Sequence, residues 1–524
     1  MKRLFGSNVI SADQQQAVQI DPRLTRTVFK NASANVFRLA GSGVIVLLLP
    51  SFLVRMLSIE AYGAWVLLMQ VATYVGLLDF GIQIAVARFV AHADELANPE
   101  QRDGIASTAL VLLAATCALG LCLVGLMTWQ LPHLFTTMPA YLHTQARVAL
   151  LLIGGSFAIG LPFSVIHAIF IGLQRNKIPV SIVLVSRLLT GVLTVSVASR
   201  HWGLAAMGGA VALANVLSYG LTYFAWRTWA GHVKIQPSLT SMSCAKDIAS
   251  YSGVMAVWSV GMLMVSGLDL TIVGIFQYSA TAYYGVAVTM TNLVAQAQTT
   301  IFSAMIPASA VLQARGHVQD QGRLLVSSTR YGMLILLAMA LPLLIGGSSI
   351  LKVWVGAEYA LHSTAIMQVL VCANVIRLSV LPYTILLLGS GQQGKVIFSP
   401  LAEGVTNLST SLVGAYLWGA IGVAFGTVLG SFVSVGLHIF YNMPRTPSIA
   451  VDRSLLFKEG LLRPLMCAVP FGILFVSKII TPQMPLTVFS SISLCATVAG
   501  VCLFWYYGLI SSERRRLQLF LVGG

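Results

Sequence analysis

The sequence predicts an all-α integral membrane protein with about fourteen transmembrane helices, and three observations support this fold class. The chain has 524 residues, of which 57% are hydrophobic and only 9% charged, and its mean hydropathy is +0.84. A soluble domain carries roughly 25% charged residues, so this composition cannot cover a water-facing surface. The apolar residues gather in runs of about 20, the length that crosses a bilayer. Segments of alternating polarity, which are typical of a transmembrane barrel, do not appear.

Each apolar run is expected to be helical because lipid offers no partner for an unpaired backbone amide. Six runs lie near 32–56, 61–90, 105–130, 146–173, 178–199 and 203–226. Six more lie near 247–276, 280–312, 326–351, 363–389, 396–417 and 419–441. Two further runs lie near 462–481 and 486–510.

The basic residues predict the orientation of these spans. The net charge is +15, but Lys and Arg are spread over many short loops, which disfavours a nucleic-acid partner. With the N-terminus inside, the external connections hold only five basic residues: Arg55, Arg147, Arg200, Lys352 and Lys478. Three more fall inside spans, and the remaining 23 of 31 lie on the cytoplasmic side. The positive-inside rule therefore places both termini in the cytoplasm.

Short repeats divide the chain into two parallel halves of six spans. Trp202-Gly203 opens the sixth span and Trp418-Gly419 opens the twelfth, and Tyr62-Gly63 is matched by Tyr284-Gly285. Such repeats are characteristic of transporters whose substrate site lies between the halves. The expected division is a cytoplasmic tail at 1–29, an N-lobe at 30–230, a C-lobe at 246–442, two added helices at 460–510 and a basic cytoplasmic tail at 511–524.

No motif predicts a cofactor or a metal. The seven cysteines form no CxxC and no Cys/His ligand spacing, which disfavours zinc and structural disulfides. The run Gly389–Lys395 reads GxxxxGK, but Val396 stands where magnesium binding needs Ser or Thr, and a membrane helix precedes it instead of a strand. We therefore expect neither a nucleotide site nor catalytic chemistry.

Ionisable residues inside the spans are functional candidates because the membrane interior makes them costly. The acids are Asp79, Asp269 and Glu403. The bases are Arg38, Arg187 and Arg377, with Arg88 near a cytoplasmic helix end.

Two of these candidates, Arg38 and Asp79, are expected at the same depth on adjacent helices, roughly 25 Å from the outer surface at 1.5 Å per residue. They can form a structural ion pair there, or act where substrate enters. Asp79 and Arg88 are nine residues apart, which puts them on opposite faces of one continuous helix.

The central arginines predict an anion site. The repeat places Arg187 and Glu403 at near-equivalent positions in the two halves, and Arg377 lies close to mid-depth. The planar fork of arginine suits a phosphate. The alternative is that these side chains satisfy one another and hold the halves together. Asp269 is either a carboxylate that couples transport to protons or cations, or a capped structural residue.

Two segments resemble a known family. The run Ala61-Tyr62-Gly63-Ala64-Trp65, with Leu77–Ile82 and Val86–Phe89, resembles the second helix of polysaccharide-lipid flippases. The run Trp418–Thr427 resembles their twelfth helix. These flippases belong to the superfamily that also contains the MATE-type multidrug exporters.

The resemblance implies two six-helix lobes in a V, open alternately to either side of a bacterial inner membrane. It also implies a substrate of undecaprenyl diphosphate bearing an oligosaccharide, moved toward the periplasm for surface polysaccharide assembly. A polysaccharide polymerase and export machinery would then be partners.

Three alternatives stay open. A cation-coupled multidrug exporter needs an acidic cavity, whereas the first span carries Arg38 and Arg55 and no acid. A peptidoglycan-precursor flippase shares the fold and the lipid carrier. A membrane-embedded polymerase or ligase typically needs a large external loop, and the longest ones here, near 131–145 and 352–362, are short.

Overall fold

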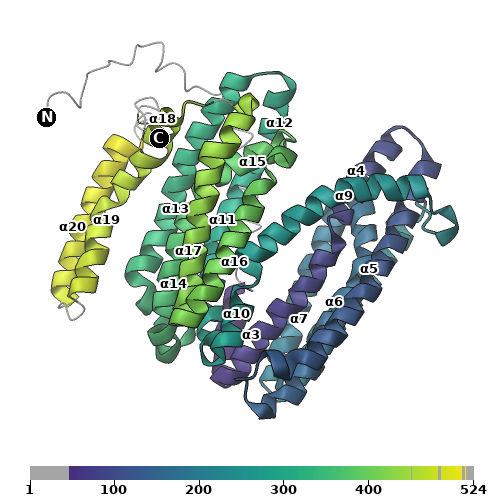
Figure 1. The fold of residues 1–524 in the computed structure, drawn as a ribbon, viewed down its shortest axis with the longest axis horizontal. Coiled ribbons are helices and arrows are strands. Elements are labelled where there is room, and N and C mark those ends of the chain that lie inside the picture. The colour runs from purple at the N-terminus through teal and green to yellow at the C-terminus, as the bar shows by residue number, and fades with distance from the viewer. Residues whose placement is uncertain (1–45, 450, 482–485, 510–513, 515–524) are drawn as a thin grey trace, which may run out of the picture.

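The protein is a bundle of long helices, as the composition predicts (Figure 1). The structure is a computed structural model that describes residues 46–449, 451–481, 486–509 and 514. Within these residues there is no β-strand, and eleven helices are long and apolar enough to cross a membrane. The expected all-α membrane fold is confirmed.

The N-lobe is built around α6, which packs against α3, α4, α5 and α8. Its helices are Val46–Met56, α3 (Ile59–Thr73), α4 (Ile82–Glu95), α5 (Pro99–Leu134), α6 (Ala140–Gly172), α7 (Lys177–Ala198) and α8 (Gly203–Trp229). The predicted tail at 1–29 and Arg38 lie outside the described residues.

The C-lobe repeats this arrangement around α14, which packs against α11, α13 and α17. Its helices are α9 (Met242–Met262), α10 (Asp269–Phe276), α11 (Thr281–Phe302), α12 (Ile306–Ala314), α13 (Val318–Val355), α14 (Ala357–Leu378), α15 (Leu381–Gly389), α16 (Phe398–Trp418) and α17 (Ala420–Gly436). The added helices α19 (Arg463–Ile480) and α20 (Leu486–Leu503) pack on each other, and α19 packs on α13.

Four spans predicted as single helices are interrupted. Between α3 and α4, Phe80 and Gly81 have φ values of 48° and 75°, a left-handed backbone that ends the helix. A π-helical turn at Leu263–Gly267 separates α9 from α10. The helices α12 and α15 each begin with a proline in their first turn, because proline is tolerated there and not in a helix interior. The prediction of continuous helices over 61–90, 247–276, 280–312 and 363–389 was therefore wrong.

Two long helices, α11 and α16, are less apolar than a typical span. Neither is among the eleven helices that are long and apolar enough to cross a membrane. Both are rich in polar side chains. In α16, Ser399, Glu403, Asn407 and Ser411 are buried inside the protein. Such polar residues are tolerated at membrane depth when they face protein or a water-filled cavity.

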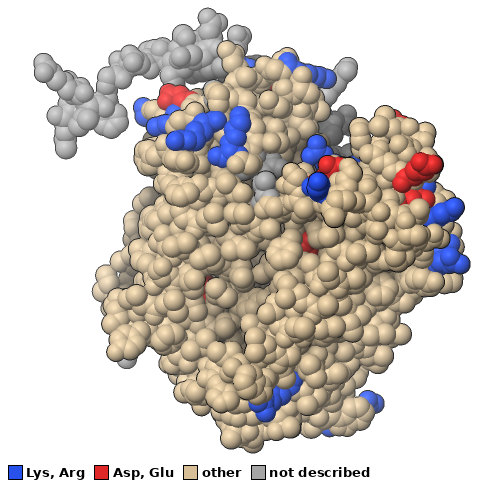
Figure 2. Space-filling model, turned by 45° about the vertical axis from the view of Figure 1, so that its right-hand side comes forward, with Lys and Arg blue, Asp and Glu red and all other residues tan. Residues whose placement is uncertain are grey.

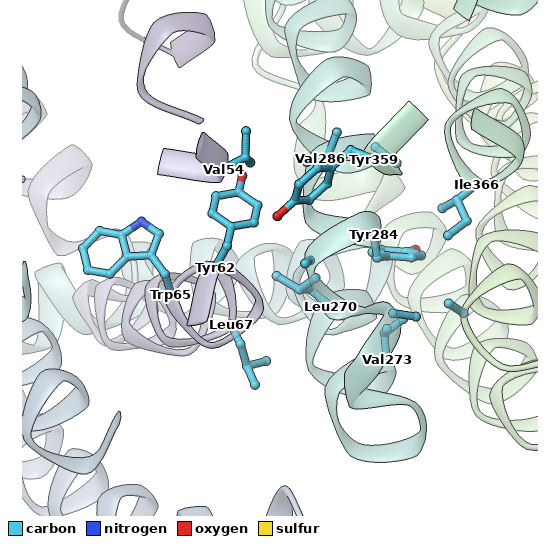
Figure 3. Packing of buried hydrophobic residues seen from close by; sticks show 14 of the residues in the cluster. Val54, Tyr62, Trp65, Leu67, Leu270, Val273, Tyr284, Val286, Tyr359 and Ile366 are labelled. Atoms are coloured by element: carbon cyan, nitrogen blue, oxygen red, sulfur yellow. The ribbon is translucent and has the colours of Figure 1, made fainter. Parts of the chain in front are cut away.

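The lobes meet at one end of the molecule, which we call the closed end. There α3 packs against α10 and α11, and one hydrophobic cluster contains residues of both lobes. Figure 3 shows Tyr62 of α3 beside Leu270 and Tyr359 of the C-lobe, and the rings of Tyr62 and Tyr359 meet edge-on with 6.0 Å between their centroids. A Cβ added to Gly63 would lie 3.3 Å from the backbone nitrogen of Ala282, so the crossing helices are in close contact. The repeated Tyr-Gly pairs of the sequence thus lie on the two helices that form this crossing.

The lobes diverge toward the opposite end, where α4, α12 and α15 lie (Figure 1). We call this the basic end. In Figure 2 most of the visible Lys and Arg side chains lie there, fewer lie at the closed end, and the band between them is almost uncharged. An uncharged band between two polar ends is what a membrane-spanning protein requires.

Candidate functional site

The charged interior of the C-lobe begins at Asp269, the first residue of α10. The π-helical turn before it interrupts the backbone and turns this carboxylate into the lobe, where it is 6% exposed. Thr427 of α17 donates a hydrogen bond to Asp269 Oδ2 over 3.0 Å, and the Tyr284 hydroxyl donates to the same oxygen over 3.4 Å. Since Tyr284 belongs to the closed end, the carboxylate is bonded directly to the residues that close the bundle.

The guanidinium of Arg377 lies between two carboxylates. Its positive charge acts on both Asp269 and Glu403, although neither carboxylate comes within ion-pair distance of it among the described residues. Arg377 Nη2 donates to Asn374 Oδ1 over 3.0 Å, whereas Nη1 is buried without a hydrogen-bond partner. The guanidinium therefore keeps one donor group, at Nη1, without an acceptor in the protein.

Glu403 completes the cluster from α16. It is 6% exposed, interacts with Ser434 of α17, and its Oε1 has no hydrogen-bond partner. Buried polar atoms are nearly always paired. An unpaired carboxylate oxygen and an unpaired guanidinium nitrogen in one cluster therefore indicate a site that takes up a ligand, a proton or water.

A second set of contacts ties this cluster to the N-lobe. The carbonyl oxygen of Gly267, two residues before Asp269, accepts hydrogen bonds from Gln70 Nε2 over 3.0 Å and from the Tyr74 hydroxyl over 2.6 Å. The Tyr74 hydroxyl is also 2.6 Å from Thr271 Oγ1. These bonds join the second span of the N-lobe to the interrupted seventh span of the C-lobe, which carries Asp269.

The sequence-predicted candidates thus fall into two groups. The structure brings Asp269, Arg377 and Glu403 together in the C-lobe. It does not bring the N-lobe candidates to them. Arg187 is exposed on α7, and the described residues hold no ion pair with it.

Asp79 and Arg88 occupy different surroundings from those expected. Asp79 Oδ2 accepts from the backbone nitrogen of Gln83 over 3.4 Å at the start of α4, and Ser164 donates to its Oδ1 over 3.4 Å. The exposed Arg88 lies over the ring of Tyr251 on α9, 5.3 Å from its centroid. The placement on opposite faces of one helix does not hold, because the backbone turns at Phe80–Gly81 between the two residues.

Sequence reasoning missed the partners of the cluster. Thr427, Ser434 and Tyr284 were not identified as site residues. One signal was present in the sequence: residues 399, 403, 407 and 411 are all polar at intervals of four, a pattern that predicts one polar stripe along a helix. The described residues contain no group of three or more His, Cys, Asp or Glu side chains that could hold a metal ion.

Comparison with protein-family models gives no match, and neither does comparison with curated proteins. Solved structures do match. The lipid II flippase MurJ in an inward closed conformation has a TM-score of 0.68 at 11% identity, covering 90% of this chain and 97% of that chain. An inward-facing multidrug resistance MATE family transporter of the MOP superfamily has a TM-score of 0.66 at 14% identity, covering 78% and 95%.

An outward-facing multidrug resistance MATE family transporter gives a lower TM-score of 0.58 at 14% identity, covering 83% of this chain and 98% of that chain. The chain therefore has the fold of MOP-superfamily membrane transporters, including a lipid flippase.

Proposed function

We propose that this protein is a flippase that moves undecaprenyl-diphosphate-linked oligosaccharide across the bacterial inner membrane for surface polysaccharide biosynthesis. The observation that carries the proposal is Arg377, whose Nη1 is buried and unpartnered in the middle of the membrane bundle. A diphosphate supplies the acceptor oxygens that this guanidinium lacks. Arg38, which lies outside the described residues, and the exposed Arg187 stay the other arginines that we propose for substrate binding.

The sugar part of the substrate needs hydroxyl partners, and α11 offers them. Asn292 and Gln296 are exposed one turn apart on this helix, whereas the neighbouring Met290 and Val294 are buried. A polar face on a helix at the meeting of the two lobes suits a hydrated oligosaccharide. The lipid part needs no such face, because the bilayer itself can hold the polyprenyl chain.

Transport would proceed by alternating access. The lobes diverge at the basic end, and we propose that this end faces the cytoplasm, in keeping with the positive-inside rule, and that the substrate is taken up from that side. Opening toward the periplasm requires separation of the closed end, including the contact of Gly63 with Ala282. Asp269 is placed to couple the two events, because its oxygen binds Tyr284 of the closed end and its charge interacts with Arg377.

A second candidate function is a cation-coupled multidrug exporter, which the likeness to a multidrug resistance MATE family transporter favours. A cationic drug needs uncompensated acidic groups. In this protein Arg377 acts on Asp269 and Glu403, the two buried acids of the C-lobe, so neither of them is without a nearby cation.

Deletion of the gene in its native host separates these functions. A flippase deletion loses surface polysaccharide while the diphosphate-linked unit is still made and stays on the inner leaflet. Normal polysaccharide together with greater sensitivity to cationic drugs would instead identify the exporter. A unit that reaches the outer leaflet but is not polymerised would identify a membrane enzyme.

A further inference from the structure

Four aromatic rings contact one another in series at the closed end, and we call them the aromatic ladder: Tyr62, Tyr359, Tyr283 and His362. The rings of Tyr62 and Tyr359 meet edge-on (Figure 3). Tyr359 contacts Tyr283 with 5.5 Å between the ring centroids, and Tyr283 stacks on His362 at 4.6 Å. Tyr62 and Tyr359 are buried, Tyr283 is half-buried and His362 is exposed. The ladder therefore runs from the contact between the lobes to the protein surface.

The buried end of the ladder carries hydroxyl groups that lack partners. Tyr62, Tyr359 and Thr281 are 1%, 5% and 0% exposed, and none of their hydroxyl oxygens has a hydrogen-bond partner in the described part of the chain. Thr281 lies at the same place, because its Cβ is 3.6 Å from the position of a Cβ added to Gly63. Buried polar atoms are nearly always paired, and leaving one unpaired costs free energy. Three unpaired hydroxyls where three helices meet indicate a place at which a ligand supplies the partners.

The ladder is divided between the two lobes. Tyr62 belongs to α3 of the N-lobe, whereas the other three rings belong to α11 and α14 of the C-lobe. Separation of the closed end therefore breaks the contact between Tyr62 and Tyr359 and uncovers both rings and their hydroxyls. A ligand site that forms only when this end opens serves the side to which the substrate is delivered.

Two carboxylates lie near the ladder, one from each lobe. The charges of Glu60 on α3 and Glu358 on α14 act on both Tyr283 and Tyr359, and both glutamates are exposed. His362 Nδ1 lies 3.0 Å from the carbonyl oxygen of Glu358, so the outermost ring is held by the turn that carries this acid. Carboxylates repel a diphosphate, but they accept hydrogen bonds from uncharged hydroxyl groups.

This combination of groups matches the chemistry of a pyranose sugar. A sugar ring has an apolar face of C–H bonds that packs on an aromatic ring, and its hydroxyl rim needs donors and acceptors. Tyrosine offers both an apolar ring and a hydroxyl. A polyprenyl chain would use neither the hydroxyls nor the carboxylates, and the carboxylates disfavour an anion. The ladder therefore suits the uncharged oligosaccharide part of a lipid-linked substrate.

We propose that the aromatic ladder is an exit site that binds uncharged sugar rings when the closed end opens, an inference that rests on the function proposed above. A sugar ring replaces the contact between Tyr62 and Tyr359. Its hydroxyls supply the partners that these two side chains and Thr281 lack. Because the sugar binds only the open arrangement, its binding shifts the equilibrium toward opening.

The exit site is tested with soluble sugars and no lipid carrier. The full chain carries Gly285→Leu, since a Cβ at Gly285 would lie 2.9 Å from Val66 Cγ2 and force the crossing apart. It is placed in lipid nanodiscs free of glycosidic detergent, and saturation-transfer-difference NMR is recorded with maltotetraose, cellotetraose and N-acetylated chitotetraose. We expect transfer to the C–H protons of at least one sugar, stronger than with the unaltered protein. Adding Tyr359→Leu should abolish it, and Tyr359→Phe, which keeps the ring, should only weaken it.

Tyr416→Leu is the matched control. Tyr416 is a tyrosine of α16 that is 81% exposed and makes no ring contact with the ladder among the described residues, so its loss should leave the transfer unchanged. A second measurement covers the case in which Gly285→Leu fails to fold. The same sugars should raise the rate at which a water-soluble maleimide labels Val286→Cys in an otherwise unaltered chain, because Val286 is buried at the closed end.

Two results would overturn the exit site. One is saturation transfer that Tyr359→Leu leaves unchanged. The other is the absence of transfer from all three sugars together with an unchanged labelling rate. The gene deletion described above tests the flippase function separately. A lipid-linked unit trapped on the inner leaflet, with no sugar binding at the ladder, would contradict only the exit site.

Discussion

The equivalent helices α7 and α16 show how differently the two lobes use the same architecture. Both are the fifth span of their lobe and pack mainly on the next helix, α8 and α17. In α7 the exposed face is apolar apart from Arg187 and includes Val185, Leu188 and Val192, and the buried positions are few. In α16 the buried face holds Glu403 and Asn407. The fold repeats, but at this span only the C-lobe carries a buried charged residue. We therefore propose that anion binding and coupling lie mainly in the C-lobe.

The largest expected effect follows from removing the central guanidinium. Arg377→Ala should abolish export, because truncating one member of a buried charge cluster costs about 2–5 kcal/mol. Arg377→Lys keeps the charge without the planar fork and should restore export only in part. Surface polysaccharide measured in the complemented deletion strain checks both.

The same assay compares the two lobes directly through Arg187. Because Arg187 is exposed on α7, Arg187→Ala should reduce export less than Arg377→Ala does. Both variants must first reach the membrane at the level of the unaltered protein. Equal losses would show that the anion site is shared evenly between the lobes.

The next effect distinguishes the buried acids of the two lobes. Asp269→Asn should slow export by roughly tenfold or more, since coupling free energies are typically 1–3 kcal/mol. Asp79→Asn should have little effect, because an amide oxygen can still accept from the Gln83 backbone and from Ser164. Initial rates of accumulation of the outer-leaflet unit measure this difference. If Asp79→Asn were the more damaging change, the assignment of coupling to the C-lobe would be wrong.

A smaller effect is expected at the closed end. A Cβ at Gly285 would lie 2.9 Å from Val66 Cγ2, so Gly285→Leu should force α3 and α11 apart at a cost of about 1–3 kcal/mol. A cysteine placed at the buried Val286 in a cysteine-free background should then react faster with a water-soluble maleimide. Gly220→Leu is the control, because a Cβ there meets nothing within 4 Å. An unchanged rate in Gly285→Leu would show that this crossing does not hold the closed end shut.

The smallest effect concerns the bonds between the lobes at Gly267. Tyr74→Phe removes the hydroxyl that bonds the Gly267 carbonyl and Thr271. Each neutral hydrogen bond contributes about 1 kcal/mol, so labelling of Val286→Cys should increase only a few-fold. A change larger than that of Gly285→Leu would mean that these bonds, and not the glycine crossing, dominate closure.

The sequence was sufficient for the membrane fold, and it singled out three residues that the structure brings together. Hydropathy predicted the helices because the bilayer imposes one length and one polarity on every span. Ionisable residues in spans identified Asp269, Arg377 and Glu403, since each must be buried in protein. The sequence did not predict that Arg187 is exposed. Which face of a helix is buried depends on its packing partners, and a single sequence does not reveal these.

The helix interruptions were missed for a related reason. Pro307 and Pro382 lie within runs that were predicted as single spans, whereas each stands in the first turn of a new helix. The contacts of Tyr284 and Thr427 with Asp269 join residues 15 and 158 positions apart, which no local pattern shows. His438 looked isolated because Asn442 becomes its partner only through a π-helical turn.

Binding of undecaprenyl diphosphate to the purified protein tests the central claim most directly. Native mass spectrometry of the full chain in detergent micelles, with undecaprenyl diphosphate and undecaprenol in equal amounts, measures whether the diphosphate is recognised. We predict preferential binding of the diphosphate by the unaltered protein and loss of this preference in Arg377→Ala. Equal binding of the two lipids, or a preference that survives in Arg377→Ala, would contradict the assignment of Arg377 as the diphosphate site.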